Sequence, residues 1–219
     1  MGIVSENVRI LLKAIPRNVI VVAAVKGRTI EEVQEAIESG IKYIGENYLQ
    51  DAEKKLPFIG NVVKWHFIGH LQKRKSKKIV KLFDMVETLD SFEVAREIDL
   101  EASKMNKIIP VLIEVNSGNE PQKSGLLPED VEPFIEKVSH FKNIKIQGLM
   151  TMGPFFEDPE KLRPYFVETR KLFDYIKNKN IQNIEMKFLS MGMSSSYKIA
   201  IEEGANILRI GTLIFGPRA

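Results

Sequence analysis

The sequence predicts a parallel (β/α)8 barrel, an α/β fold in which strands and helices alternate along the chain. Two observations carry this prediction: short apolar, strand-like runs recur eight times, and an amphipathic helical pattern separates each run from the next. No Pro-, Gly- or Ser-rich linker divides the chain, so we expect a single domain over residues 1–219. Eight βα units with right-handed crossovers close into a barrel, and an open doubly wound sheet is the competing topology.

The runs predicted as strands are rich in apolar side chains, which is typical of strands buried on both faces. They lie at 18–25, 41–45, 63–68, 84–88, 108–115, 145–150, 185–189 and 206–210. The helical patterns lie at 5–14, 29–39, 47–56, 72–82, 91–104, 128–140, 159–178 and 195–203.

The helix expected at 29–39 shows how well the local signals agree. Thr29 and Glu32 have the spacing of a capping box, in which each side chain bonds the backbone of the other residue. Apolar residues then recur at helical spacing on one face, and Gly40 supplies a left-handed stop before the next strand.

Charge and composition exclude several classes of protein. The 32 basic and 29 acidic side chains leave a net charge of +3, too small to indicate a polyanion partner by itself. The absence of cysteine excludes a disulfide scaffold, a cysteine–zinc site and thiol chemistry. No stretch approaches the roughly 20 apolar residues of a membrane helix, and the N-terminus lacks a basic segment leading into an apolar one. We therefore expect a cytoplasmic protein without a membrane partner.

Two further patterns receive plain explanations. Six basic residues from Lys73 to Lys81 fall on the helix expected at 72–82, but no aromatic residues for base stacking lie between them. A solvated helix face therefore fits better than a nucleic-acid site. His66 and His70 have a spacing that suits a metal only on a helix, and here they straddle a strand end, with His140 far away. We expect no metal site.

In a (β/α)8 barrel, catalytic and binding groups collect where the strands end and the following loops begin. Polar residues and glycines lie at most of these positions. They are Lys26, Gly45-Glu46-Asn47, His66 to His70, Asn116-Ser117-Gly118, Met150 to Gly153, Ser190 to Ser194, and Arg209 to Thr212.

Lys26 closes the apolar run Val19–Val25 and precedes Gly27. This position puts an amine at the mouth of a core, where desolvation lowers the pKa of a lysine and favours its reaction with an aldehyde. Lys26 is therefore a candidate nucleophile for a cofactor such as pyridoxal phosphate (PLP). Taken alone, it could also end the strand and extend to water.

The loops after the seventh and eighth strands are the usual phosphate site of this fold. Ser194 is predicted to cap a helix that begins near Ser195, with its hydroxyl and the free amides facing an anion. Gly211 and Thr212 offer further amides and a hydroxyl. Each loop alone fits a simple cap or turn, but together they predict a phosphate site.

Arg209 is the only charged residue in its apolar run. Beside a pyridine nitrogen, a guanidinium acts only as a hydrogen-bond donor and opposes protonation of the ring. Such an arrangement weakens the cofactor as an electron sink. An ion pair with an acid of a neighbouring strand, such as Glu46 or Glu114, is the alternative.

Seven segments together resemble the pyridoxal phosphate homeostasis proteins, a PLP-binding family whose barrel is similar to that of bacterial alanine racemase. They are Ala23-Ala24-Val25-Lys26, Gly45-Glu46-Asn47-Tyr48, Trp65 to Gln72, Gln122-Lys123-Ser124-Gly125, Gly148 to Met152, Leu189 to Ser194, and Arg209 to Thr212.

The resemblance implies a Schiff base between PLP and Lys26, and a pyridine nitrogen that faces Arg209. It also implies a role for several other residues. Ser194, Gly211 and Thr212 would hold the phosphate, Asn47 would lie near the cofactor, and Met191, Gly192 and Met193 would line the approach to the phosphate.

Two departures from the family's pattern stand out. The lysine is followed by Gly27-Arg28-Thr29 where Thr-Lys-Pro is usual, so the loop over the aldehyde is expected to differ. Gln72 is followed by Lys73-Arg74-Lys75 where an asparagine is common, which bears on a surface helix.

The resemblance also argues against racemase activity. Alanine racemase uses a second base, a tyrosine from a separate β-domain of its partner subunit, and this sequence ends seven residues after Thr212. With one base and Arg209 opposing ring protonation, turnover is expected to be slow. We therefore expect a monomeric protein that binds, buffers or delivers PLP to PLP-dependent apo-enzymes, in line with the family's association with vitamin B6 balance.

Two enzymatic alternatives stay open at this point. One is a PLP-dependent amino-acid enzyme of low activity, and the other is a barrel aldolase or isomerase that uses Lys26 without a cofactor.

Overall fold

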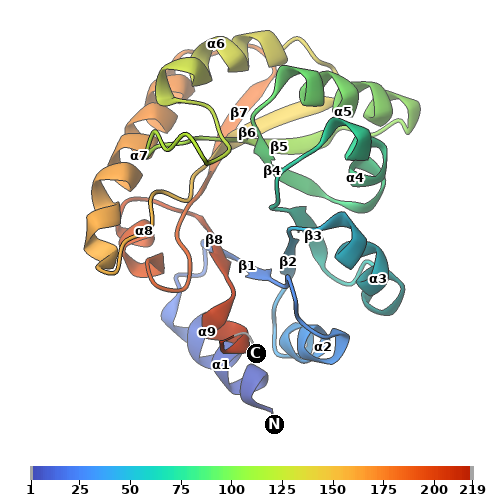
Figure 1. The fold of residues 1–219 in the computed structure, drawn as a ribbon, viewed down its shortest axis with the longest axis vertical. Coiled ribbons are helices and arrows are strands. Elements are labelled where there is room, and N and C mark those ends of the chain that lie inside the picture. Colours follow the sequence, from blue (N-terminus) through green and yellow to red (C-terminus); the bar gives the residue numbers. More distant parts are fainter. Residues whose placement is uncertain (1, 218–219) are drawn as a thin grey trace.

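The chain forms a closed barrel of parallel strands surrounded by helices (Figure 1). The structure is a computed structural model that describes residues 2–217. The first strand pairs with both the second and the eighth, so the sheet is a closed ring. This confirms the predicted (β/α)8 barrel and excludes the open sheet.

The strands follow one another around the ring in chain order. They are β1 (Ile20–Ala24), β2 (Tyr43–Glu46), β3 (Lys64–Phe67), β4 (Met85–Leu89), β5 (Ile109–Glu114), β6 (Ile144–Met150), β7 (Ile184–Ser190) and β8 (Ile207–Ile210). The α-helices are α1 (Ile3–Ala14), α2 (Ile30–Glu38), α3 (Leu49–Ile59), α4 (Ser76–Leu82), α5 (Phe92–Lys104), α6 (Pro128–Val138), α7 (Arg163–Asn178), α8 (Tyr197–Glu202) and α9 (Thr212–Phe215).

The predicted strands all coincide with observed ones, and their ends differ by no more than two residues. Two predicted helices start differently, because each opens with a 3-10 turn, Lys73–Lys75 before α4 and Pro159–Leu162 before α7. The one-turn helix α9 was not predicted, since four residues are too few to show a period.

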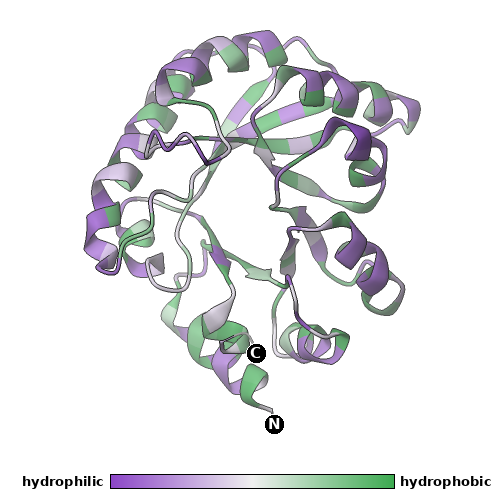
Figure 2. Cartoon of the chain, in the orientation of Figure 1, coloured by the Kyte–Doolittle hydropathy of each residue, from purple (hydrophilic) through white to green (hydrophobic). Residues whose placement is uncertain are grey.

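Two apolar clusters hold the barrel together. The larger one packs the inner faces of the helices against the outside of the sheet. A smaller cluster takes one side chain from each of five strands, which fills the interior of the barrel; its buried members are Val22, Met85, Leu112, Met150 and Ile207. In Figure 2, where the ribbon is coloured by residue hydropathy, the strands are mainly hydrophobic and outer helices such as α3 and α4 contain many hydrophilic residues.

Helix α1 lies outside the ring and packs beside α9, so the two ends of the chain lie on the same side of the barrel (Figure 1). Asn7 on α1 donates a hydrogen bond to the carbonyl of Ile214 on α9 at 3.0 Å. Within residues 2–217, no helix is long and apolar enough to cross a membrane.

The capping box at the start of α2 forms as predicted. Thr29 Oγ1 accepts from the Glu32 amide at 3.2 Å, and Glu32 Oε2 accepts from the Thr29 amide at 2.8 Å. Gly40 adopts a φ of +115° just after the helix, a conformation that favours glycine. The loop between β1 and α2 is thus fixed at its helix end.

Replacing Thr29 with alanine should lower the free energy of unfolding by about 1 kcal/mol, the usual cost of losing an N-cap hydroxyl. Urea unfolding measures the change. Thr29→Ser keeps the hydroxyl and is the matched control, so equal losses in the two variants would contradict the capping role.

Candidate functional site

A cavity of about 540 Å³ opens at the carboxyl ends of the strands, a size suited to a small organic ligand. Loops after β1, β2, β3, β6, β7 and β8 contribute to its wall. Its lining residues are Ala24, Lys26, Asn47, Ile68, Met152, Met193, Ser194, Ser195, Arg209, Gly211, Thr212 and Leu213.

Lys26 reaches this cavity from a tight turn. Strand β1 ends at Ala24, and the Arg28 amide donates to the Val25 carbonyl at 3.1 Å, which closes a four-residue turn. Gly27 occupies the third position with a φ of +69°, the backbone that a type II turn requires there. The half-buried Lys26 therefore lies at the rim of the barrel, as the sequence predicted.

A buried ion pair fixes the backbone on which Lys26 stands. Lys55 Nζ on α3 donates to Glu46 Oε2 at 2.9 Å and to the Val25 carbonyl at 3.1 Å. Burial, only partly offset by Lys55, raises the pKa of Glu46 above its ordinary value. The ends of β1 and β2 are thereby tied together next to the cavity.

Asn47 follows β2 and lines the cavity. Its Nδ2 donates to the Ile68 carbonyl at 3.3 Å, while its buried Oδ1 has no hydrogen-bond partner among residues 2–217. A buried polar atom without a partner costs free energy.

Ser194 does not cap a helix, and this prediction was wrong. Helix α8 begins at Tyr197, after Ser196, and Ser196 Oγ accepts from the Met193 amide at 3.2 Å. Ser194 Oγ instead accepts from the Leu213 amide at 3.2 Å. The hydroxyl therefore joins the loop after β7 to the first turn of α9.

The three residues before Ser194 divide between core and cavity. Met191 is fully buried in the main core and does not line the cavity, contrary to expectation. Gly192 also lies off the cavity, and an added Cβ would lie 2.5 Å from Ala200. Only Met193, which is partly exposed, lies in the wall as predicted.

Arg209 lines the cavity floor and is almost fully buried. Arg209 Nη1 donates to Ser190 Oγ at 2.6 Å, and Arg209 Nη2 donates to the Thr151 carbonyl at 2.8 Å. The ion pair foreseen as an alternative does not form with Glu46 or Glu114. The carboxylate within ion-pair distance is that of Glu87, 4.0 Å away.

Glu87 connects Arg209 to the far wall of the barrel. Its carboxylate is fully buried and accepts from Ser190 Oγ and from His66 Nδ1, both at 2.6 Å. Burial raises the pKa of Glu87, but His66, Arg209 and Ser190 outweigh this effect, so the pKa lies below its usual value. Side chains of β3, β4, β7 and β8 thus form one charged network under the cavity.

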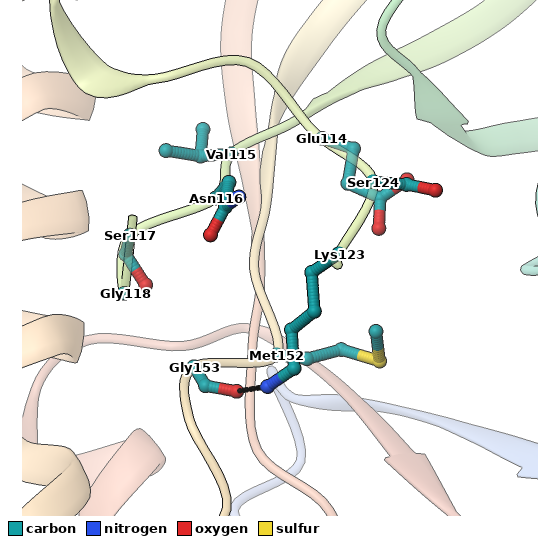
Figure 3. Close-up of a pocket in the computed structure, with 9 residues that line it drawn as sticks. All are labelled: Glu114, Val115, Asn116, Ser117, Gly118, Lys123, Ser124, Met152 and Gly153. Atoms are coloured by element: carbon teal, nitrogen blue, oxygen red, sulfur yellow. Dashed lines mark hydrogen bonds between the residues drawn. The ribbon is translucent and has the colours of Figure 1, made fainter. Parts of the chain in front are cut away.

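A second, smaller pocket lies under the loop that follows β5 (Figure 3). Lys123 Nζ donates to the Gly153 carbonyl at 2.8 Å, which ties this loop to the loop after β6. Met152 lines both the smaller pocket and the main cavity. Ser124 Oγ lies 3.1 Å from His70 Nδ1, so the Gln122–Gly125 segment also reaches the loop after β3.

Glu114, at the end of β5, lines the smaller pocket. Burial and the nearby charge of Asp90 raise the pKa of Glu114 to about 7, while Arg209 opposes the shift. This carboxyl therefore changes charge near neutral pH.

Sequence reasoning placed Ser190 and Thr151 at the rim but missed Glu87 and the contacts that join the three residues. Glu87 lies on β4, Ser190 ends β7 and Thr151 follows β6, and the Ser190–Glu87 contact joins residues 103 positions apart. A charged residue inside an otherwise apolar strand, as in Met85–Leu89, was the available signal.

Comparison with known proteins agrees with this geometry. A family model described as alanine racemase, N-terminal domain, matches residues 2–219. An alanine racemase from Clostridium difficile 630 has the same fold, with a TM-score of 0.78 at 15% identity over 98% of this chain and 56% of its own. The fold and the cavity therefore define a protein of the alanine racemase barrel class.

More similar relatives narrow this class. A pyridoxal phosphate homeostasis protein from Aquifex aeolicus is 42% identical over 86% of this chain and 82% of the relative. A protein of the same name from Schizosaccharomyces pombe is 36% identical over 92% of this chain and 85% of its own. PipY of Synechococcus elongatus, solved with PLP bound, superposes with a TM-score of 0.90 at 27% identity, over 97% of this chain and 100% of its own. This chain belongs to the family of pyridoxal phosphate homeostasis proteins.

The raised pKa of Glu114 predicts a pH-dependent stability. The folded protein keeps Glu114 protonated up to about pH 7, whereas the unfolded chain releases this proton near the ordinary value of 4.5. The contribution of Glu114 is therefore fully present below pH 4.5 and is lost as the pH rises through about 7. The full loss is about 3 kcal/mol, at 1.36 kcal/mol per pKa unit.

Glu114→Gln mimics the protonated carboxyl and should remove this loss. Urea unfolding of both proteins from about pH 4 to about pH 8 should show the wild type weakening relative to the variant. Parallel pH profiles for the two proteins would contradict the raised pKa.

Proposed function

We propose that this chain binds pyridoxal 5'-phosphate covalently through Lys26 and serves as a PLP carrier in cellular B6 homeostasis, without racemase turnover. The observation that carries the proposal is one cavity that brings together the amine of Lys26 and the guanidinium of Arg209. The same cavity is lined by Ser194, Gly211 and Thr212, which offer hydroxyl and amide groups to an anion. The PLP named in the PipY structure and the name shared by the curated relatives support the same ligand.

The residues of the cavity fit this cofactor. Lys26, Asn47 and Arg209 place an amine, an amide and a guanidinium in one cavity wall. At Gly211, an added Cβ would make only an ordinary contact with Ala24, at 3.7 Å. The fold itself therefore does not require glycine at this position, and the absence of a side chain leaves room in the cavity wall.

Each side chain has a distinct task in the proposal. PLP supplies a reactive aldehyde and an electron-withdrawing ring when it is bound. Lys26 Nζ attaches to the aldehyde carbon with loss of water, while Ser194, Gly211 and Thr212 hold the phosphate through hydroxyl and amide hydrogen bonds. Asn47 contacts the cofactor, and Met193 covers the approach to the phosphate.

The fixed position of Arg209 favours a binding function over a catalytic one. The network of Ser190, Glu87 and the Thr151 carbonyl fixes its guanidinium in the floor of the cavity. A fixed guanidinium donates hydrogen bonds and does not give up a proton, so it keeps a facing ring nitrogen unprotonated. Carbanion chemistry at the cofactor is thereby disfavoured.

The wider role follows from the same site. A protein that holds PLP at an open rim can buffer it and pass it to PLP-dependent apo-enzymes. We propose that it does so in the cytoplasm, as a monomer with a single domain over residues 1–219.

Covalent attachment is tested by adding PLP and reducing with borohydride. A yellow protein that bleaches, with the adduct mapped to Lys26, is expected; Lys26→Ala should take up no covalent PLP, because Lys26 is the lysine that lines the cavity among residues 2–217. Lys64→Ala removes an exposed lysine at the opposite end of the barrel and is the matched control.

The same preparation distinguishes a carrier function from an enzymatic one. Assays with D- and L-amino acids should show no multiple turnovers. Turnovers lost in Lys26→Ala would refute the carrier role, and a wild-type protein that takes up no PLP would refute the ligand.

The phosphate end has its own test. Gly211→Ala should fold as stably as the wild type, because the added methyl group meets Ala24 only in ordinary contact. The methyl group would occupy the room that glycine leaves in the cavity wall and displace the phosphate. PLP binding should therefore weaken by roughly tenfold, which corresponds to the loss of about one good hydrogen bond. Titration followed by absorbance measures the affinity, and an unchanged affinity would remove Gly211 from the site.

A further inference from the structure

The guanidinium of Arg28, two residues after Lys26, reaches across to the end of α9. Its nitrogens donate to the Phe215 carbonyl at 3.2 Å and to the Gly216 carbonyl at 2.5 Å. The guanidinium carbon also lies 5.3 Å from the centre of the Phe215 ring. Only 8% of the Arg28 side chain is exposed, so these contacts are sheltered from water.

Helix α9 depends on such contacts. It has one turn, from Thr212 to Phe215, and a helix of this length has no stability of its own. The last carbonyls of a helix lack partners within it. Here Asn7 bonds the carbonyl of Ile214, and Arg28 bonds those of Phe215 and Gly216.

The other end of α9 forms the cavity wall. Gly211, Thr212 and Leu213 line the cavity, and the Leu213 amide donates to Ser194 Oγ. A displacement of one turn of helix moves both of its ends. Arg28 therefore acts on the wall of the cavity from outside it.

Arg28 is itself held in place by the start of α2. Its guanidinium lies 3.3 Å from Glu32 Oε1, while the other oxygen of Glu32 accepts from the Thr29 amide in the capping box. The Arg28 amide closes the turn that carries Lys26. One residue thus links the turn of Lys26 to α9.

We propose that Arg28 is a positioning residue that holds α9 in the place where Gly211 and Thr212 can grip the phosphate of the ligand. The inference rests on the proposed function for the identity of the ligand. Arg28 does not line the cavity, so its guanidinium acts on the ligand through α9 and not by direct contact.

Lysine cannot replace arginine in this role. A guanidinium offers several donors in one plane and stacks on an aromatic ring, whereas an ammonium is a single point charge. Arg28→Lys keeps the charge and loses the two-carbonyl grip, so it tests geometry separately from charge. Arg28→Ala removes both.

The first measurement is hydrogen exchange on the cofactor-free protein. Arg28→Lys and Arg28→Ala should speed exchange at the amides of Leu213 and Gly216, which bond Ser194 Oγ and the Thr212 carbonyl in the wild type. Amides of the central strands should be unchanged. Arg170→Ala, which breaks an exposed ion pair on α7, is the matched control and should change neither set.

The second measurement compares PLP with pyridoxal, which lacks the phosphate. Both Arg28 variants should raise the dissociation constant for PLP by roughly tenfold and leave that for pyridoxal within about twofold, because only the phosphate contacts α9.

Unchanged exchange in α9, or equal losses for PLP and pyridoxal, would overturn the positioning role. Faster exchange in α9 with a wild-type protein that binds no PLP would support the link between Arg28 and α9 while refuting the proposed ligand. The two failures are therefore distinguishable.

Discussion

The pairing of β1 with β8 is the constraint on which the site depends. This contact closes the ring, and its register sets Val22 opposite Arg209 and Ala23 opposite Ile210. Residues that are almost two hundred positions apart in the chain therefore leave the barrel side by side. The turn of Lys26 and the first turn of α9 begin next to each other because the two strands end at the same level.

Under that rim, the barrel interior holds a network of buried ionisable and polar side chains. Arg209, Glu87 and His66 are all buried, and each has hydrogen-bond partners in the network. Buried ions are expensive to desolvate, and packed apolar side chains often stabilise a core as well or better. The network therefore adds little to the free energy of unfolding. It is well suited to holding one guanidinium at a fixed height below a ligand.

The sequence was sufficient for the barrel and for most of its rim. Apolar, strand-like runs identified every strand, and the Thr29 capping box was visible because its partners are three residues apart. Contacts between distant segments produce no comparable pattern in the sequence. The partner of Ser194 is Leu213, and the neighbour of Arg209 is Glu87, so a local helix cap and a nearby acid were natural but wrong expectations. The expected position of Met191 differs from the observed one for another reason, because a methionine in a loop can face either a cavity or the core.

The closed sheet also limits how another protein can meet this one. An open sheet ends in strands with unpaired backbone groups, to which a second chain can add a strand of its own. Here each strand has a neighbour on both sides, and helices cover the outside (Figure 1). Under the proposed carrier function, a protein that receives PLP would therefore approach end-on, over the loops around the cavity. Recognition would then depend on side chains of those loops, which differ most readily among related proteins.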